Sequence, residues 1–335
     1  MRNAMKQLGM CAGLFAAGLL ALAPRGGSQA SPTPQQPQEP SSQEPGIRRE
    51  VGLVNIFATV RNKNKRIVTG LKKEDFKILE DNAEQKIAFF SAESALPITI
   101  GMLIDTSGSE EHMIGAIQDG GSRFLSRVMR KGDEAMVISF DLDVDLLSDF
   151  TDDRSQLERA IRRTRINTAG GNVAVTPGPL PTSTAPNGTH LYDAIYLACA
   201  DKLASEAGRK AIVILTDAED VGSKLRLEEA IEAAQRTDTV VHVLLIHERG
   251  GFGFGGGWRP DVAKKITDET GGRMIDVTSE KRLEEAFDQI SEELRNEYTL
   301  GYYASRDGKF HKIKVETVNK DLKVMARKGY YAPKS

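Results

Sequence analysis

Hydrophobic residues follow two patterns along the chain, and the first occupies its middle. Residues 97–105 and 211–217 are unbroken apolar runs that end in an aspartate, as is typical of strands buried on both faces. Strands that alternate with helices predict a doubly wound α/β fold, with a mainly parallel sheet between two layers of helices. Further strands are expected at 135–140, 239–247 and 273–277, and helices at 110–130, 153–165, 224–236, 260–270, 280–296 and from Thr189 onward.

The second pattern consists of short strand-like segments, which flank the α/β region on both sides. β-branched and aromatic residues dominate these segments, and Asn, Asp and Gly residues separate them. We expect the strands before and after the α/β region to pair with each other, so that both flanks form one small β-rich module. The segments lie at 51–61, 76–80, 85–90, 298–303, 309–318 and 322–327.

The N-terminus has the pattern of a targeting signal. Arg2 and Lys6 precede an apolar run at 8–23 that is short for a membrane span. We expect a cleaved secretory signal peptide, with an uncleaved anchor helix or a lipid on Cys11 as alternatives. The expected division of the chain is a signal peptide at 1–30, a Pro/Gln-rich linker at 31–46, a β-rich N-terminal module at 47–95, the α/β domain at 97–296 and a C-terminal β extension at 297–335.

Composition removes several classes of function. The 335 residues include 45 Lys and Arg against 47 Asp and Glu, a net charge of −2, so no electrostatic footprint for nucleic acid is present. Only two cysteines occur, which excludes a disulfide scaffold and a Cys-rich zinc site. After signal cleavage only Cys199 remains, in an apolar helical pattern where a buried thiol is expected.

Oxygen-bearing side chains gather where the apolar strands end. Asp105, Ser107 and Ser109 follow the first strand, Thr189 opens a helix, and Asp217 ends the strand at 211–217. In open α/β sheets, sites form beyond the carboxyl ends of the strands, so these side chains are expected at one edge. Carboxylates and hydroxyls without sulfur or imidazole suit hard divalent cations, and Mg²⁺ in particular.

The order D-x-S-x-S at 105–109, GTxLYDA at 188–194 and TD at 216–217 resembles a von Willebrand factor A (VWA) domain, with a Rossmann-like fold and a metal-ion-dependent adhesion site (MIDAS). The resemblance covers residues 97–296. The flanks, with GLKKEDFKILEDNAEQKIAFF before it and LRNEYTLGYY after it, resemble a secreted bacterial subgroup common in acidobacteria.

This resemblance implies a role for each of the five residues. Ser107, Ser109 and, in the ligand-competent form, Thr189 would coordinate Mg²⁺ directly, while Asp105 and Asp217 would act through bound waters. Mn²⁺ or Ca²⁺ could replace Mg²⁺. The remaining position would take an Asp or Glu carboxylate of a partner protein, and a shift of the C-terminal helix would couple this binding to the rest of the domain.

Two departures from the family pattern affect the expected site. Ala218 stands where the family often has glycine, and the long loop at 167–187 would overhang the metal.

The resemblance implies a secreted or periplasmic protein-binding and adhesion module without catalytic residues, and a monomer is expected. The alternative is a structural envelope scaffold whose metal site is vestigial or covered by that loop.

Other interpretations of the same residues are weaker. Ser107 and Ser109 could simply cap the following helix. A hydrolase using Asp105 as a nucleophile would need D-x-D-x-[TV], whereas the chain has D-T-S-G-S. The glycine-rich stretch at 250–257 satisfies G-x-G-x-x-G only because glycines are so frequent there, and we expect a surface loop.

Overall fold

The computed structural model describes residues 51–92, 96–166, 188–247 and 257–334. All of them belong to one compact unit, Arg48–Ser335. The predicted signal peptide, the predicted linker, the predicted loop at 167–187 and residues 250–256 of the glycine-rich stretch lie outside the described residues. Among the helices that are described, none is long and apolar enough to cross a membrane.

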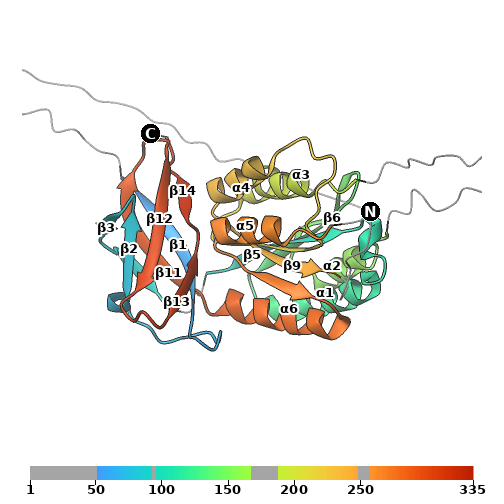
Figure 1. The fold of residues 1–335 in the computed structure, drawn as a ribbon, viewed down its shortest axis with the longest axis horizontal. Coiled ribbons are helices and arrows are strands. Elements are labelled where there is room, and N and C mark those ends of the chain that lie inside the picture. Colours follow the sequence, from blue (N-terminus) through green and yellow to red (C-terminus); the bar gives the residue numbers. More distant parts are fainter. Residues whose placement is uncertain (1–50, 93–95, 167–187, 248–256, 335) are drawn as a thin grey trace, which may run out of the picture. The chain divides into compact units, whose positions relative to one another are not determined.

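A sheet flanked by helices forms the centre of the α/β region (Figure 1). It has six strands, in the order β10–β9–β8–β5–β6–β7. All neighbouring strands are parallel except β7, which runs antiparallel to β6 at the edge. Every residue of β5 and β9 is buried, as their unbroken apolar runs predict. The strands are β5 (Ile98–Asp105), β6 (Glu134–Phe140), β7 (Val144–Thr151), β8 (Arg209–Thr216), β9 (Thr239–Ile246) and β10 (Met274–Val277).

Helices cover both faces of this sheet, each face with its own hydrophobic core. One face carries α1 (Ile114–Val128), α2 (Arg154–Ile161) and α6 (Glu280–Arg295), and the other carries α3 (Leu191–Tyr196), α4 (Leu227–Arg236) and α5 (Pro260–Thr270). A side chain at Gly120 of α1 would meet the Phe287 ring at 3.0 Å, so glycine permits the close approach of α6. The predicted doubly wound α/β fold is confirmed.

Two of the expected helices differ from the prediction in their first or last turns. The helix expected at 110–130 is divided into a 3₁₀ helix at Gly108–Glu110 and α1. The helix expected from Thr189 begins at Leu191 and continues as a π-helix at Leu197–Lys202 and a 3₁₀ helix at Leu203–Ser205. Hydrogen-bond patterns of this kind depend on tertiary packing, and hydrophobic spacing alone does not distinguish them.

The flanking segments form two four-stranded sheets, in the orders β13–β1–β11–β4 and β14–β12–β2–β3. Strand β1 pairs antiparallel with β11 across more than two hundred residues of sequence, with Val54 opposite Tyr302 and Ile56 opposite Leu300. The predicted β-rich module built from both flanks is therefore present. Its strands are β1 (Val51–Arg61), β2 (Phe76–Glu80), β3 (Ala83–Gln85), β4 (Phe89–Ser91), β11 (Tyr298–Ser305), β12 (Phe310–Thr317), β13 (Lys323–Ala326) and β14 (Gly329–Tyr331).

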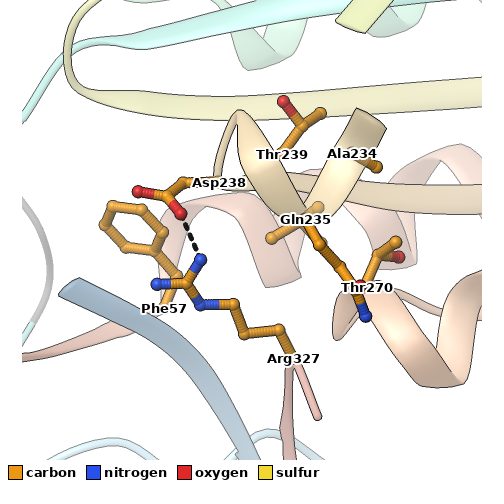
Figure 2. Close-up of a pocket in the computed structure, with 8 residues that line it drawn as sticks. Phe57, Ala234, Gln235, Asp238, Thr239, Thr270 and Arg327 are labelled. Atoms are coloured by element: carbon orange, nitrogen blue, oxygen red, sulfur yellow. Dashed lines mark hydrogen bonds and ion pairs between the residues drawn. The ribbon is translucent and has the colours of Figure 1, made fainter. Parts of the chain in front are cut away.

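Arginine residues join this module to the α/β region. Arg327 forms an ion pair with Asp238 (Figure 2). Its guanidinium also donates to the carbonyl oxygen of Asn55 at 2.6 Å. A cavity of about 10 Å³ lies beside this pair, lined in part by Phe57 and Gln235. Such a volume holds one water molecule at most, so the cavity belongs to the junction and is too small for a ligand.

Candidate metal centre

The carboxyl ends of β5 and β8 bring two aspartates to the same edge of the sheet. The strands are parallel neighbours, with Ile104 opposite Leu215, so Asp105 and Asp217 follow at adjacent positions. Asp105 is 0% exposed and Asp217 is 7% exposed. The fold thus places two buried carboxyl groups where the sequence predicts the site.

Hydroxyl groups surround the Asp105 carboxyl. Its Oδ1 accepts hydrogen bonds from the Ser107 hydroxyl at 2.6 Å and the Ser107 amide at 2.9 Å, and its Oδ2 accepts from the Thr216 hydroxyl at 2.6 Å. The Ser107 and Ser109 hydroxyl oxygens are 3.0 Å apart. Ser107 makes no side-chain cap to the 3₁₀ helix that follows it, so its hydroxyl belongs to the carboxylate cluster and the capping interpretation fails for this residue.

Thr189 lies beside the loop that carries Asp217. Its amide donates to the carbonyl of Val221 at 2.9 Å, and the Val221 amide donates back to the Thr189 carbonyl at 3.0 Å. The next amide, that of His190, donates to the carbonyl of Asp141 at 2.8 Å. These bonds hold the start of the α3 segment between the loops that follow β6 and β8.

Glu110 is a member of this centre that sequence analysis missed. Its side chain is 1% exposed, and one carboxylate oxygen each of Asp105, Glu110 and Asp217 lie within 4.8 Å of one another. Within the described part of the chain, Glu110 Oε2 has no hydrogen-bond partner. The neighbouring Glu111 is exposed, and the polar run that contains both glutamates gives no signal that one of them turns inward.

The electrostatics of the three acids favour a bound cation. Burial, and then the Asp217 charge, raise the pKa of Asp105 to about 7 against the hydrogen bonds from Ser107 and Thr216. Burial, followed by the charges of Asp105 and Asp217, raises the pKa of Glu110 well above its usual value. Burial also raises the pKa of Asp217. A divalent cation would compensate these charges, and the all-oxygen donor set with an unpaired buried carboxylate oxygen fits a hard metal ion.

The loop after β8 contains a strained residue and a structural acid. Ala218 has φ of 63°, in the left-handed region that favours glycine, and its amide donates to the Thr216 hydroxyl at 2.9 Å. Asp220, beyond it, accepts from the Tyr192 amide at 3.1 Å and from the Ser223 hydroxyl at 2.6 Å. Asp220 therefore orders the start of α3.

A family model described as von Willebrand factor type A domain matches residues 100–219. This segment of the α/β region is therefore similar to von Willebrand factor type A (VWA) domains. The matched segment contains all five residues that the resemblance assigned to the metal site. The secreted bacterial subgroup that the flanking segments resemble stays a prediction. The sequence matches no curated protein.

Several solved structures are similar to this chain at low sequence identity. BatB of Bacteroides thetaiotaomicron, described as a conserved hypothetical protein, is 16% identical with a TM-score of 0.45, and the match covers 59% of this chain and 100% of BatB. A von Willebrand factor type A protein of Catenulispora acidiphila is 12% identical with a TM-score of 0.48, over 83% of this chain and 73% of that one. Proximal thread matrix protein 1 from the mussel byssus is 14% identical with a TM-score of 0.48, over 65% of this chain and 50% of that one.

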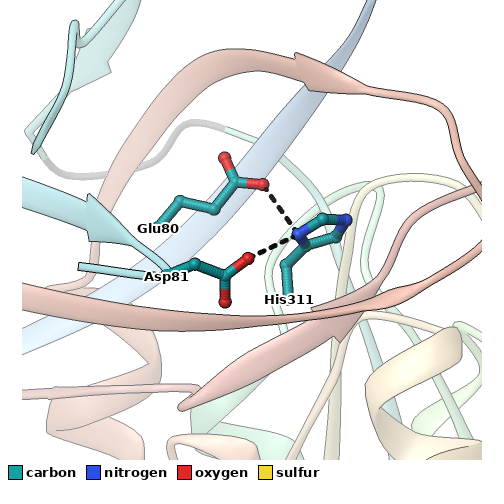
Figure 3. Close-up of side chains that lie close together, drawn as sticks. All are labelled: Glu80, Asp81 and His311. Carbon is teal, nitrogen blue, oxygen red and sulfur yellow. Dashed lines mark hydrogen bonds and ion pairs between the residues drawn. The ribbon is translucent and has the colours of Figure 1, made fainter. Parts of the chain in front are cut away.

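A second group of acids surrounds His311 in the β-rich module. Its Nδ1 lies 2.8 Å from Asp81 Oδ2 and 3.3 Å from Glu80 Oε1 (Figure 3), and its Nε2 lies 3.1 Å from Asp307 Oδ1. Burial lowers the pKa of His311, but hydrogen bonds to Asp307 and Asp81 outweigh it and raise the pKa overall. Both ring nitrogens thus face carboxylates, and a protonated imidazole that ties the β2–β3 turn to β12 accounts for the cluster.

Proposed function

We propose that this VWA protein binds a partner protein through a divalent cation of the MIDAS type, Mg²⁺ in the first place and Mn²⁺ or Ca²⁺ as alternatives. Asp105, Ser107, Ser109, Thr189 and Asp217 would hold the ion. The observation that carries the proposal is the convergence of buried Asp105 and Asp217 with two serine hydroxyls at one sheet edge.

Each of these residues has a separate task in such a site. Asp105 supplies charge from the buried side, and Ser107 and Thr216 fix its orientation through hydrogen bonds of 2.6 Å. Ser109 is exposed, so its hydroxyl lies on the side that a partner can approach. The bound cation would supply a Lewis-acidic position for an Asp or Glu carboxylate of the partner.

A binding role is favoured over a hydrolytic one. Asp105 is 0% exposed and its carboxyl group accepts hydrogen bonds from Ser107 and Thr216, so a substrate has little access to it as a nucleophile. Burial raises the pKa of Cys199 to about 12, so its thiol stays protonated and unreactive. We therefore propose that the protein is not an enzyme.

The location proposed for this function is the periplasm or the exterior of the cell. It rests on Arg2, Lys6 and the apolar run at 8–23, which together have the form of a secretory signal. The Pro/Gln-rich segment at 31–46 would then separate the folded part from the point of export.

Calorimetric titration of the purified protein with Mg²⁺ and Mn²⁺ tests the proposal. We expect binding that Asp105→Ala abolishes, because the variant removes the most deeply buried charge of the site. Asp152→Ala is the matched control, since Asp152 is an exposed aspartate that follows β7 at the opposite edge of the sheet. A pull-down of envelope proteins with and without EDTA then tests metal-dependent capture.

Two outcomes would contradict the proposal. A wild-type protein that binds neither ion favours the structural scaffold with a vestigial or covered site. Equal metal binding by Asp105→Ala and Asp152→Ala would place the metal elsewhere on the chain.

A further inference from the structure

Glu110 brings a third acid to the proposed metal centre, and one of its buried carboxylate oxygens has no hydrogen-bond partner among the described residues. It ends the 3₁₀ helix Gly108–Glu110, which carries its side chain inward while Glu111 points to solvent. The carboxylate is buried, and among the described residues no group donates to its Oε2. A buried carboxylate oxygen without a donor is costly, so it indicates a missing cation or proton at this position.

The position of this carboxylate decides between those possibilities. Its ligand oxygen lies within 4.8 Å of ligand oxygens from Asp105 and Asp217. Three acids so close together repel one another in a buried site, and a cation with metal–oxygen distances of about 2.0–2.6 Å can bridge them after small movements. A proton on Glu110 would relieve only one of the three charges.

We propose that Glu110 is a third carboxylate of the metal centre, and that its charge lets the protein retain a divalent cation before any partner carboxylate arrives. This inference rests on the proposed metal-dependent function and deepens it. With Asp105 and Asp217 alone, a divalent cation is just compensated. With Glu110 the site carries one more negative charge, and the affinity of oxygen sites for such ions increases with the number of charged ligands.

The same charge affects the partner. A cation that is already over-compensated attracts a further carboxylate less strongly, because like charges at one site oppose each other. Glu110 therefore raises the affinity of the site for the metal and lowers the affinity of the bound metal for the partner carboxylate, so that capture of the partner is reversible.

Calorimetry of partner-free protein with Mg²⁺ and Mn²⁺ tests this role of Glu110. Glu110→Gln keeps the shape of the side chain and removes its charge, and we expect metal affinity to fall at least tenfold. Glu111→Gln is the matched control on the next residue, where the side chain is exposed, and it should leave the affinity unchanged. If the amide variant does not fold, Glu110→Met supplies an apolar side chain of similar length for the same titration.

Thermal unfolding distinguishes a metal role from a structural one. In EDTA, Glu110→Gln should melt at the wild-type temperature or higher, because the variant removes an acid whose ionisation is opposed by burial and by its two acidic neighbours. In saturating Mg²⁺ the variant should gain less stability than the wild type, since stabilisation by a ligand follows its affinity. A purely structural glutamate would instead lower the melting temperature equally in both buffers.

The outcomes separate this inference from the proposed function. Wild-type binding with a loss below threefold in Glu110→Gln, or an equal loss in Glu111→Gln, overturns the role of Glu110 and leaves the MIDAS proposal standing. Absence of metal binding to the wild type overturns both.

Discussion

At the scale of single residues, the Asp105 carboxyl group couples the site to pH. It is fully buried, and its pKa in the folded protein is about 7 against an ordinary value of 3.8. At a pH between these two pKa values, Asp105 holds a proton in the native state that it has released in the unfolded state. Stability then falls as pH rises, because the native state binds more protons in this range. Glu110 and Asp217, whose pKa values are also raised, act in the same direction.

We predict that metal-free protein loses stability from about pH 4 to pH 7, by roughly 4 kcal/mol at most for Asp105, since each pH unit between the two pKa values corresponds to about 1.4 kcal/mol. Urea unfolding in EDTA across this range measures the loss. Asp105→Asn should show a shallower fall, because it has no proton to release, and Mg²⁺ should reduce the fall in the wild type. A metal-free wild type with the same pH profile as Asp105→Asn would contradict the prediction.

The sequence predicted some residues of the site and did not predict others. Asp105 and Asp217 directly follow buried strands, and parallel strands end at one edge, so their convergence was predictable. Glu110 was missed because the choice between two adjacent glutamates is made by a single 3₁₀ turn, for which the sequence has no periodic signal. The left-handed backbone of Ala218 was indicated only by the glycine that the family often has there.

At the scale of elements, the C-terminal end of α6 is fixed by three arginines from other segments and by one of its own. Arg61 of β1 and Arg273 both pair with Glu293, and Arg295 pairs with Asp133. Arg209 of β8 pairs with Glu297 and donates to the carbonyl of Leu294. A sliding movement of this helix, which the family resemblance implies, would have to break several buried ion pairs at once.

The Arg209–Glu297 pair offers a test of this anchoring. Arg209→Met should lower the free energy of unfolding by roughly 3–5 kcal/mol, because the buried Glu297 carboxylate loses its partner. Urea denaturation measures the loss. Arg226→Met is the matched control, since Arg226 pairs with Glu229 in solvent, and it should cost less than about 1 kcal/mol.

A second substitution identifies the cause of the loss. Adding Glu297→Leu to Arg209→Met removes the unpaired charge, so the double variant should recover much of the stability. Equal losses in Arg209→Met and Arg226→Met would mean that the pair does not anchor α6.

At the scale of the whole molecule, the β-rich module depends on both flanks of the chain. The alternating pattern predicted strands on each side, but which strand pairs with which is decided by shape and register across the fold. Both strands that pair with β1 come from the far flank, β11 on one side and β13 on the other. The core between the two sheets likewise combines residues such as Ile56 and Ile78 with Tyr298 and Tyr302.

Neighbouring tyrosines of β11 make this dependence measurable. Tyr302 is 0% exposed in the module core, whereas Tyr303 on the opposite face is 62% exposed. Tyr302→Ala should destabilise the module by roughly 3–5 kcal/mol, as expected for a large buried aromatic side chain. Hydrogen exchange should then become fast in β1, although β1 lies at the other end of the sequence. Amides of β5, in the separate core of the α/β domain, should stay protected.

Tyr303→Ala is the control, because it shortens a side chain of the same strand on its exposed face. It should leave protection in β1 close to wild type. If Tyr302→Ala accelerates exchange in β5 as much as in β1, the arginine contacts at the junction unite the module and the VWA domain into one cooperative unit. If β1 remains protected, the far flank is not what holds it in place. Exchange confined to β1 and its partners means that the module unfolds locally and leaves the proposed metal-binding edge of the six-stranded sheet intact.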